Sequence, residues 1–268
     1  MTTVVLSHFS MNDDELQVIA ERTGVEDLPT VLALRPRHGD TATLHAAFDR
    51  ATRALVARGL IRDGLVAPDV ASLMRALHRP DRELAMRIVT PEGISRVSIV
   101  RQGSLGVLAR RVGNTFVLST FDAGVSAATR AVLAELPRME PARIDPVSAP
   151  LDAMTECLNG HGGGPQLADR IHALVADRRS AMLLGSALSS RMAFAEIVYH
   201  PLASDEGRIS RCPAAVAVFY TKRGRITAAP SASPSGQLWV TLKPGSDHTI
   251  TQAVGQLIGL SPERWEDP

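Results

Sequence analysis

The fold of this chain is decided by four neighbouring runs of sequence: ELAMRIVT (83–90), ISRVSIVRQ (94–102), LGVLARRV (105–112) and TFVLSTF (115–121). Each run reads as a β-strand rich in apolar residues. Short turn signals separate them, namely Pro91-Glu92-Gly93, Gly103-Ser104 and Gly113-Asn114. Connections this short join antiparallel neighbours. The four runs therefore predict an antiparallel sheet.

Helical patterns lie on both sides of these strands. Apolar residues at helical spacing, such as Leu44, Phe48, Ala51 and Leu55, predict three helices before the strands. We expect these helices over 10–24, 41–59 and 68–80, the first of them capped by Ser10. A fourth helix is expected over 125–136, and residues 1–9 read as a short first strand.

The second half of the chain repeats this order of elements. Residues 137–150 hold four prolines and predict a semi-extended connector. Beyond it, helices are expected over 151–159, 166–179 and 247–260, and strands at RMAFAEIVYH (191–200), AAVAVFYTK (214–222), GRITAAP (224–230) and QLWVTLK (237–243). The fold class is therefore α+β. The element order further suggests one domain built from two related halves, 1–136 and 151–268, whose half-sheets join.

Composition restricts the classes of function. The chain has 268 residues and a net charge of +1, from 29 basic and 28 acidic side chains. That balance argues against a dominant surface for nucleic acid or for an anionic membrane. No apolar run approaches the roughly 20 residues of a membrane span, and the N-terminus does not resemble a signal peptide. We expect Cys157 and Cys212 to be reduced and buried in a cytosolic protein, with a disulfide as the less favoured alternative.

One motif raises the question of catalysis. His161-Gly162-Gly163-Gly164 resembles the oxyanion loop of lipases and esterases. That chemistry also requires a nucleophile in a GxSxG elbow, and the chain contains none. A loop between two helices is therefore favoured, with a serine hydrolase as the alternative. The chain also lacks the phosphate-loop, dinucleotide and HExxH motifs. We expect no catalytic residue, no metal and no cofactor.

The arginines suggest a second alternative. Arg101, Arg110 and Arg111 lie on neighbouring predicted strands, where they can form a basic face. Sheets that bind nucleic acid usually add several aromatic side chains for base stacking. Here the matching strands offer only Phe116 and Phe121. Solvated or paired arginines are favoured, and a nucleic-acid-binding regulatory module remains the alternative.

An ordered set of segments resembles one known family: LPTVL (28–32), ARGL (57–60), RPDREL (79–84), ARRVG (109–113), RGR (223–225), PSASP (230–234), GQLW (236–239) and QAV (252–254). Over nearly its whole length the chain resembles the ESX secretion-associated proteins of the EspG family, from actinobacterial type VII secretion. The resemblance implies a cytosolic chaperone without enzymatic activity, which binds PE–PPE heterodimers at the tip of the PPE subunit and keeps them soluble for export. It also implies a central antiparallel sheet flanked by two helical bundles, with halves related by a quasi-two-fold axis.

The resemblance also suggests where the partner binds. In the family pattern the hairpin nearest the substrate corresponds to Thr90, Pro91, Glu92, Gly93, Ile94 and Ser95. A weaker candidate is the strand that holds Phe194, Ile197 and Tyr199, for which plain core packing is the alternative. We expect no nucleic acid and no membrane insertion. The oligomeric state stays open, because exposed strand edges can pair two chains or be blocked.

Overall fold

The computed structural model of the chain describes residues 8–34, 38–160, 163–175, 177–203 and 208–267. These residues form two compact units. Unit 1 consists of the described residues up to Ala85 together with Ser95–Ala128, and unit 2 consists of Met86–Ile94 and Thr129–Asp267. The predicted connector 137–150 lies inside unit 2, and its last residues form the strand β8 (Val147–Pro150).

Unit 1 contains the sheet that the four runs predict. Its strands lie side by side in the order β1 (His8–Asn12), β7 (Thr115–Asp122), β6 (Leu105–Val112), β5 (Gly93–Gln102) and β4 (Arg82–Thr90). The β1–β7, β7–β6 and β6–β5 pairs are antiparallel, with Met11 opposite Phe116 and Ser98 opposite Ala109. Residues 86–90 of β4 and 93–94 of β5 belong to unit 2. The antiparallel prediction is confirmed.

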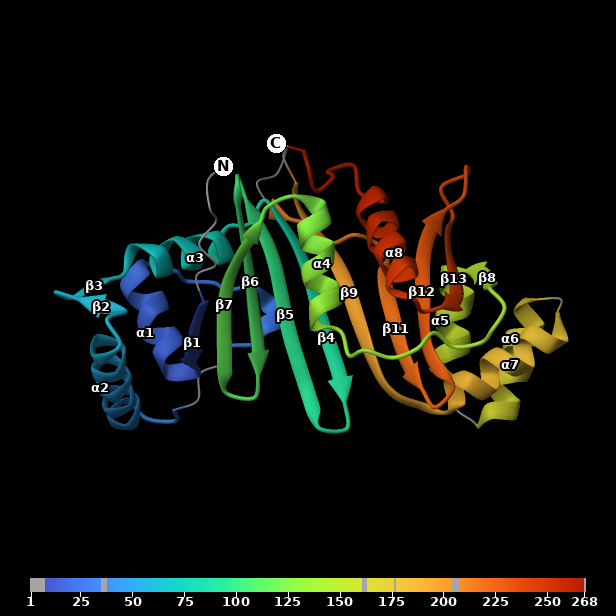
Figure 1. Cartoon of the computed structure of the whole chain (residues 1–268), viewed down its shortest axis with the longest axis horizontal. Helices are drawn as coiled ribbons and strands as arrows, with labels where there is room; N and C mark the ends of the chain where they lie inside the picture. The colour runs from blue at the N-terminus through green and yellow to red at the C-terminus, as the bar shows by residue number, and fades with distance from the viewer. Residues whose placement is uncertain (1–7, 35–37, 161–162, 176, 204–207, 268) are drawn as a thin grey trace. The chain divides into compact units, whose positions relative to one another are not determined.

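The helices of unit 1 are α1 (Asp13–Thr23), α2 (Thr41–Ala57), α3 (Pro68–His78) and the first turn of α4 (Val125–Glu135), together with the 3-10 turn η1 (Thr30–Leu32) and the small hairpin of β2 (Ile61–Arg62) and β3 (Leu65–Val66). Figure 1 shows α1, α2 and α3 grouped beside β1, and their apolar residues pack with those of β5, β6 and β7 into one core. The helices lie where the sequence predicts them.

The cap of α1 differs from the prediction. Ser10 lies in β1 opposite Val117, so it cannot start the helix. Asn12 is the N-cap instead, because its side chain accepts a hydrogen bond from the Glu15 backbone N–H at 2.9 Å. The Glu15 carboxylate accepts one from the Asn12 backbone N–H at 2.9 Å, which completes a capping box. Gly24 ends the helix in the left-handed conformation at φ 67°, as expected.

Unit 2 contains a second run of antiparallel strands: β9 (Arg191–Ala203), β11 (Ala215–Thr221), β12 (Gly224–Ala232), β13 (Leu238–Pro244) and β8, with the short β10 (Arg208–Ile209) pairing with β9. One sheet face packs against α5 (Leu151–Asn159), α6 (Gly164–Leu174) and α7 (Arg178–Ser189) through a core that includes Phe219 and Val240. Val216 and Val218, which alternate with that face, are buried on the other side, and α8 (Asp247–Gly259) packs on β11 and β12 (Figure 1).

The sequence predicts α6 but misses α7. The predicted helix over 166–179 corresponds to α6, which ends at Leu174, and the separate helix α7 then runs from Arg178 to Ser189. The new start is set by Asp177, whose carboxylate accepts hydrogen bonds from the backbone N–H groups of Arg179 and Ser180 at 3.2 and 3.0 Å. The α+β class is confirmed, since antiparallel strands and flanking helices form both units. Cys157 and Cys212 are free and buried. Among the described residues, no helix is both long and apolar enough to cross a membrane.

Candidate functional site

The hairpin between β4 and β5 presents an exposed tip. Pro91, Glu92, Gly93 and Ile94 are exposed, with Ile94 at 44% of its full exposure, whereas Thr90 and Ser95 are half-buried. The Thr90 hydroxyl donates a hydrogen bond to the Gly93 carbonyl at 3.3 Å, which ties the two ends of the turn together. A hydrogen bond with the Thr90 side chain also holds the pKa of Glu92 below its ordinary value. The tip therefore offers a carboxylate beside an apolar side chain.

Strand β9 turns its predicted contact residues to two different faces. Side chains alternate along a strand, so Phe194 lies on one face while Ile197 and Tyr199 lie on the other. Phe194 is half-buried and sits opposite Phe219 of β11. The guanidinium of Arg191 lies 5.5 Å from the centre of the Phe194 ring and 5.9 Å from that of Phe219, within cation–π range of both. These three side chains form an aromatic and cationic cluster at the edge of the core under α5–α7.

The other two predicted residues of β9 are buried. Ile197 and Tyr199 have no exposed surface. The Tyr199 ring lies 6.3 Å, centre to centre, from the ring of Trp265, and its hydroxyl donates a hydrogen bond to the Glu263 carbonyl at 3.0 Å. These contacts fasten the C-terminal segment to the sheet. They are the core packing that the sequence allows as the alternative for this strand.

An ion pair that the sequence analysis missed lies on the same face of β9 as Phe194. Arg87 Nη2 of β4 lies 3.3 Å from Glu196 Oε2, and the two side chains keep 44% and 36% of their exposure. Glu196 shares its face with Phe194, two residues away. The pair joins residues that are 109 positions apart, so no local spacing reveals it. Only alternation along 191–200 could have separated Phe194 and Glu196 from the buried residues.

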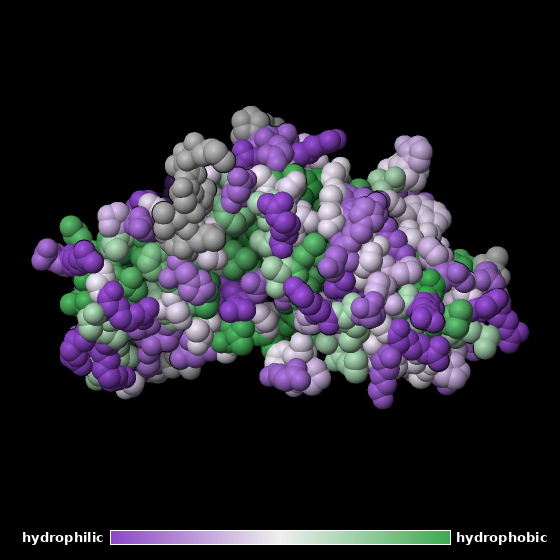
Figure 2. Space-filling view, in the orientation of Figure 1, coloured by the Kyte–Doolittle hydropathy of each residue, from purple (hydrophilic) through white to green (hydrophobic). Residues whose placement is uncertain are grey.

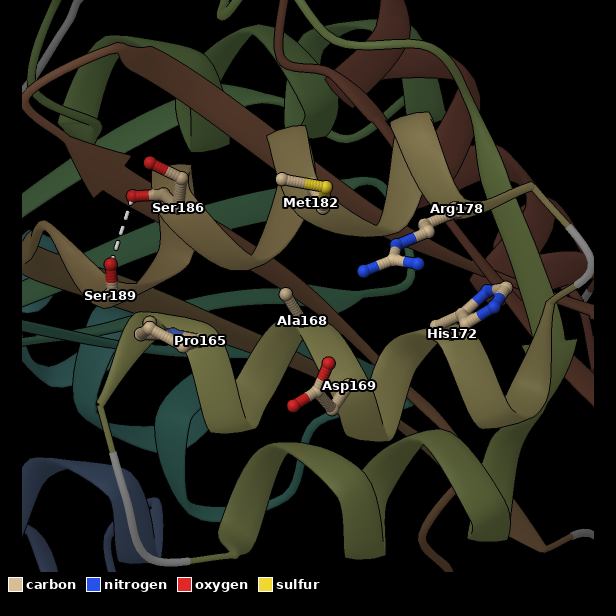
Figure 3. A pocket seen from close by; sticks show the side chains of 9 residues that line it. Pro165, Ala168, Asp169, His172, Arg178, Met182, Ser186 and Ser189 are labelled. Carbon is tan, nitrogen blue, oxygen red and sulfur yellow. Dashed lines mark hydrogen bonds between the residues drawn. The ribbon is translucent and has the colours of Figure 1, made fainter.

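A groove of about 660 Å³ runs between α6 and α7 (Figure 3). The two helices can approach closely because Gly185 has no side chain. A Cβ at this position would lie only 2.8 Å from the Ala168 backbone. Figure 3 shows His172 and Arg178 at one end of the groove, and Ser186 and Ser189 at the other. The exposed side chain of Met182 lies between the two ends.

This arrangement gives no support to hydrolase chemistry. The Ser189 hydroxyl donates to the Ser186 carbonyl at 3.0 Å rather than pointing to a base, and a serine nucleophile needs a base within hydrogen-bonding reach. Of the glycine motif, His161 and Gly162 lie outside the described residues. Gly163 is the N-cap of α6 and Gly164 its first residue, so these glycines begin a helix.

The arginines of β5 and β6 that could form a basic face have interaction partners. Arg111 forms an ion pair with Asp13 at 3.1 Å, donates to the Leu32 carbonyl at 2.8 Å and lies over the Phe116 ring. Arg101 donates to the Gly103 carbonyl at 3.0 Å, and Arg110 also has an interaction partner. On the face in Figure 2, hydrophilic and hydrophobic residues are interspersed within each unit. Across the described part of the chain, no three His, Cys, Asp or Glu residues are grouped as a metal site.

Comparison with known proteins adds independent findings. A family model described as the EspG family matches residues 12–256. The chain is 28% identical over 262 residues to the ESX-1 secretion-associated protein EspG1 of Mycobacterium marinum, covering 95% of this chain and 89% of the relative. It is 26% identical over 268 residues to the ESX-3 secretion-associated protein EspG3 of Mycobacterium tuberculosis, covering 93% and 90%.

Among solved structures, the fold is similar to that of EspG5, a type VII secretion system chaperone of Mycobacterium tuberculosis solved in complex with a PE25–PPE41 dimer. The TM-score is 0.78, and the alignment covers 96% of this chain and 98% of the other. The sequence identity is 18%, so this likeness concerns the fold.

Proposed function

The chain belongs to the EspG family, and from that premise we propose that it is a chaperone of a type VII (ESX) secretion system. It binds a PE–PPE heterodimer through the PPE subunit and keeps the pair soluble until export. The observation that carries the proposal is the family match over residues 12–256, and the likeness of fold to a chaperone solved with a PE–PPE dimer supports it. We place this activity in the cytoplasm and assign no catalytic step to it.

The physical properties of unit 2 suit this role. A helical secretion substrate with exposed apolar residues self-associates unless another surface covers them. The hairpin tip offers the exposed Ile94 next to Glu92, and strand β9 offers the half-buried Phe194 next to Glu196. Since the net charge of the chain is only +1, we expect shape and a few apolar anchors to supply affinity and charge pairs to supply specificity.

We propose the hairpin Thr90, Pro91, Glu92, Gly93, Ile94 and Ser95 as the main contact, with Phe194 beside it. Ile197 and Tyr199 are buried and do not touch the partner. They contribute indirectly, because their packing holds β9 in place. In this reading the family hairpin and one face of a single strand contribute to the interface. A standard interface buries about 1,600 Å² in total, so we expect further residues of the chain to take part.

The proposal is tested by co-expressing the chain with a panel of PE–PPE pairs, followed by affinity capture and size exclusion. We expect a stable 1:1:1 complex with some pairs and not with others. The free chain on the same column reports its oligomeric state. If the folded chain retains none of the pairs in the panel, the proposed function is wrong.

The role of the hairpin is tested by Glu92→Arg. This change reverses an exposed charge, so we expect an affinity for the cognate pair at least tenfold lower and an unchanged circular dichroism spectrum. Glu26→Arg is the matched control, since Glu26 is an exposed glutamate of a loop in unit 1. Equal affinities of the two variants and the wild type would remove the hairpin from the interface.

A further inference from the structure

Unit 2 contains a large pocket on the face of its sheet that α8 covers. The pocket has a volume of about 990 Å³ and lies between the second half of α4, the first residues of the connector 137–150 and the start of α8 (Figure 1). Tyr220 of β11 and Arg225 of β12 are paired in register, and they alternate with Phe219 and Ile226, which belong to the core under α5–α7. The pocket, which Arg225 lines, therefore lies on the opposite face of the sheet from α5–α7.

Arg225 holds the walls of this pocket together. Only 5% of its side chain is exposed, its Nε donates a hydrogen bond to the Gly245 carbonyl at 2.5 Å, and its Nη2 forms an ion pair with Asp247. Its backbone N–H donates to the Glu140 carbonyl at 2.8 Å, and its own carbonyl accepts a hydrogen bond from the Ala142 N–H at 2.9 Å. One buried residue thus fixes both the connector and the start of α8.

The pocket carries an excess of positive charge. The guanidinium groups of Arg130, Arg138 and Arg225 line it together with the carboxylates of Glu140 and Asp247. Because Arg225 and Asp247 neutralise each other, two exposed arginines remain beside one exposed carboxylate. The start of α8 adds the equivalent of about half a positive charge. The pocket is therefore suited to an anion, although the chain as a whole has a net charge of only +1.

Hydrogen-bond donors accompany the positive charge. The Ser246 hydroxyl accepts a hydrogen bond from the Thr249 N–H at 3.1 Å, whereas the N–H groups of Asp247 and His248, in the first turn of α8, have no partner within the helix. The Tyr220 hydroxyl is buried and has no hydrogen-bond partner among the described residues. Burial raises the pKa of Tyr220 to about 12, so this hydroxyl keeps its proton and remains a donor.

We propose that this pocket binds the phosphate group of a small molecule, either inorganic phosphate or a small phosphate ester. Arg130 and Arg138 supply planar guanidinium groups, which match the oxygen atoms of a phosphate. The start of α8 supplies backbone N–H groups, which bind phosphate at many helix N-termini. Leu133 and Met139 form an apolar wall beside these donors, so we expect an ester with an apolar body to bind more tightly than free phosphate. The inference goes beyond the proposed function, because it requires no protein partner.

The first test compares ligands on the free wild-type chain. Isothermal titration calorimetry with inorganic phosphate and with phenyl phosphate is carried out at constant ionic strength, because salt screens exposed charges. We expect saturable binding of both, with phenyl phosphate at least threefold tighter. Equal affinities would assign the site to inorganic phosphate. The absence of saturable binding at millimolar concentrations, or binding of phenol as tight as that of phenyl phosphate, would overturn the proposal.

The second test removes the charge that the pocket contributes. In the double variant Arg130→Gln/Arg138→Gln, we expect phenyl phosphate to bind at least tenfold more weakly. Arg143→Gln is the matched control, since Arg143 is an exposed arginine of the same connector that does not line the pocket, and its affinity should be unchanged. Circular dichroism checks the folding of each variant, and the two single variants replace the double one if it does not fold. Affinities that are equal in the wild type and in the pocket variants would show that phosphate binds elsewhere and would overturn the proposal.

Discussion

Glu83 makes the stability of unit 1 depend on pH. It lies on β4, is only 5% exposed, and accepts a hydrogen bond from the Ser98 hydroxyl at 2.6 Å. Burial raises the pKa of its carboxyl from the ordinary 4.5 to about 7, although the hydrogen bond from Ser98 opposes the shift. Between pH 4.5 and about pH 7, the Glu83 carboxyl of the folded chain therefore holds a proton that the unfolded chain has lost.

The sign and size of the effect follow from linkage. A raised acid pKa contributes stability that is fully present below pH 4.5 and is lost as the pH rises through about 7. Each pKa unit corresponds to about 1.4 kcal/mol, so the full loss is about 3 kcal/mol. Most of it falls between pH 5 and pH 8.

The test compares the wild type with Glu83→Gln, which keeps the shape of the side chain and an acceptor for Ser98 but cannot ionise. Urea unfolding followed by far-UV circular dichroism, with amide exchange of β4 and β5 as a local readout, is measured at pH 5, 6, 7 and 8. The free energy of unfolding of the wild type, relative to the variant, should fall across this series by about 2–3 kcal/mol, most of it below pH 7.

Two further variants sharpen the comparison. Ser98→Ala removes the hydrogen bond that favours the charged carboxyl, so the pKa of Glu83 rises further and the loss of stability extends to higher pH. Glu26→Gln, at an exposed position of the same unit, reports the effect of removing a carboxylate as such. A difference between wild type and Glu83→Gln that stays constant over the whole series refutes the reasoning.

Three further predictions concern helices and thiols. Asn12→Ala removes the side chain that caps α1 and should lower the free energy of unfolding by about 0.5–2 kcal/mol, measured by urea unfolding. Gly185→Ala forces a methyl group against the Ala168 backbone and should destabilise by about 1–3 kcal/mol, whereas Gly255→Ala in α8, where no atom lies within 4 Å, should stabilise by up to about 1 kcal/mol; the opposite order of their melting temperatures contradicts this packing. Cys157 and Cys212 are buried, and burial raises the pKa of both thiols, so a disulfide reagent at pH 8 should react slowly with the folded chain and at once after denaturation. Rapid reaction of the folded chain would show that one of the thiols is accessible.

Local patterns were sufficient to predict most elements of the fold. Apolar runs and turn residues such as Gly113-Asn114 predict the strands between 82 and 122, and the structure contains these strands and turns. Details that depend on strand pairing were predicted wrongly. The sequence analysis assigns the cap of α1 to Ser10, but Ser10 pairs with Val117 in the sheet and Asn12 is the cap instead. Likewise, the helix α7, which the sequence analysis did not predict, begins where the side chain of Asp177 caps it.

The candidate site was predictable only in part. The exposed hairpin at Pro91 and Glu92 is visible in the sequence as a turn, and its role in binding stays a prediction. The ion pair of Arg87 with Glu196 depends on a strand pairing that no local feature encodes. Contacts that join distant parts of the chain need the three-dimensional structure.

The distribution of aromatic residues determines what spectroscopy can observe in this molecule. The chain has two tryptophans and two tyrosines, Trp239, Trp265, Tyr199 and Tyr220, and all four belong to unit 2. Trp265, buried beside Tyr199, is a natural reporter of the C-terminal segment. Intrinsic fluorescence excited near 295 nm therefore reports on unit 2 alone. The aromatic side chains of unit 1 are phenylalanines, which do not absorb at that wavelength, so the unfolding of unit 1 is not detected. An engineered tryptophan in unit 1 would make the two units distinguishable in one experiment.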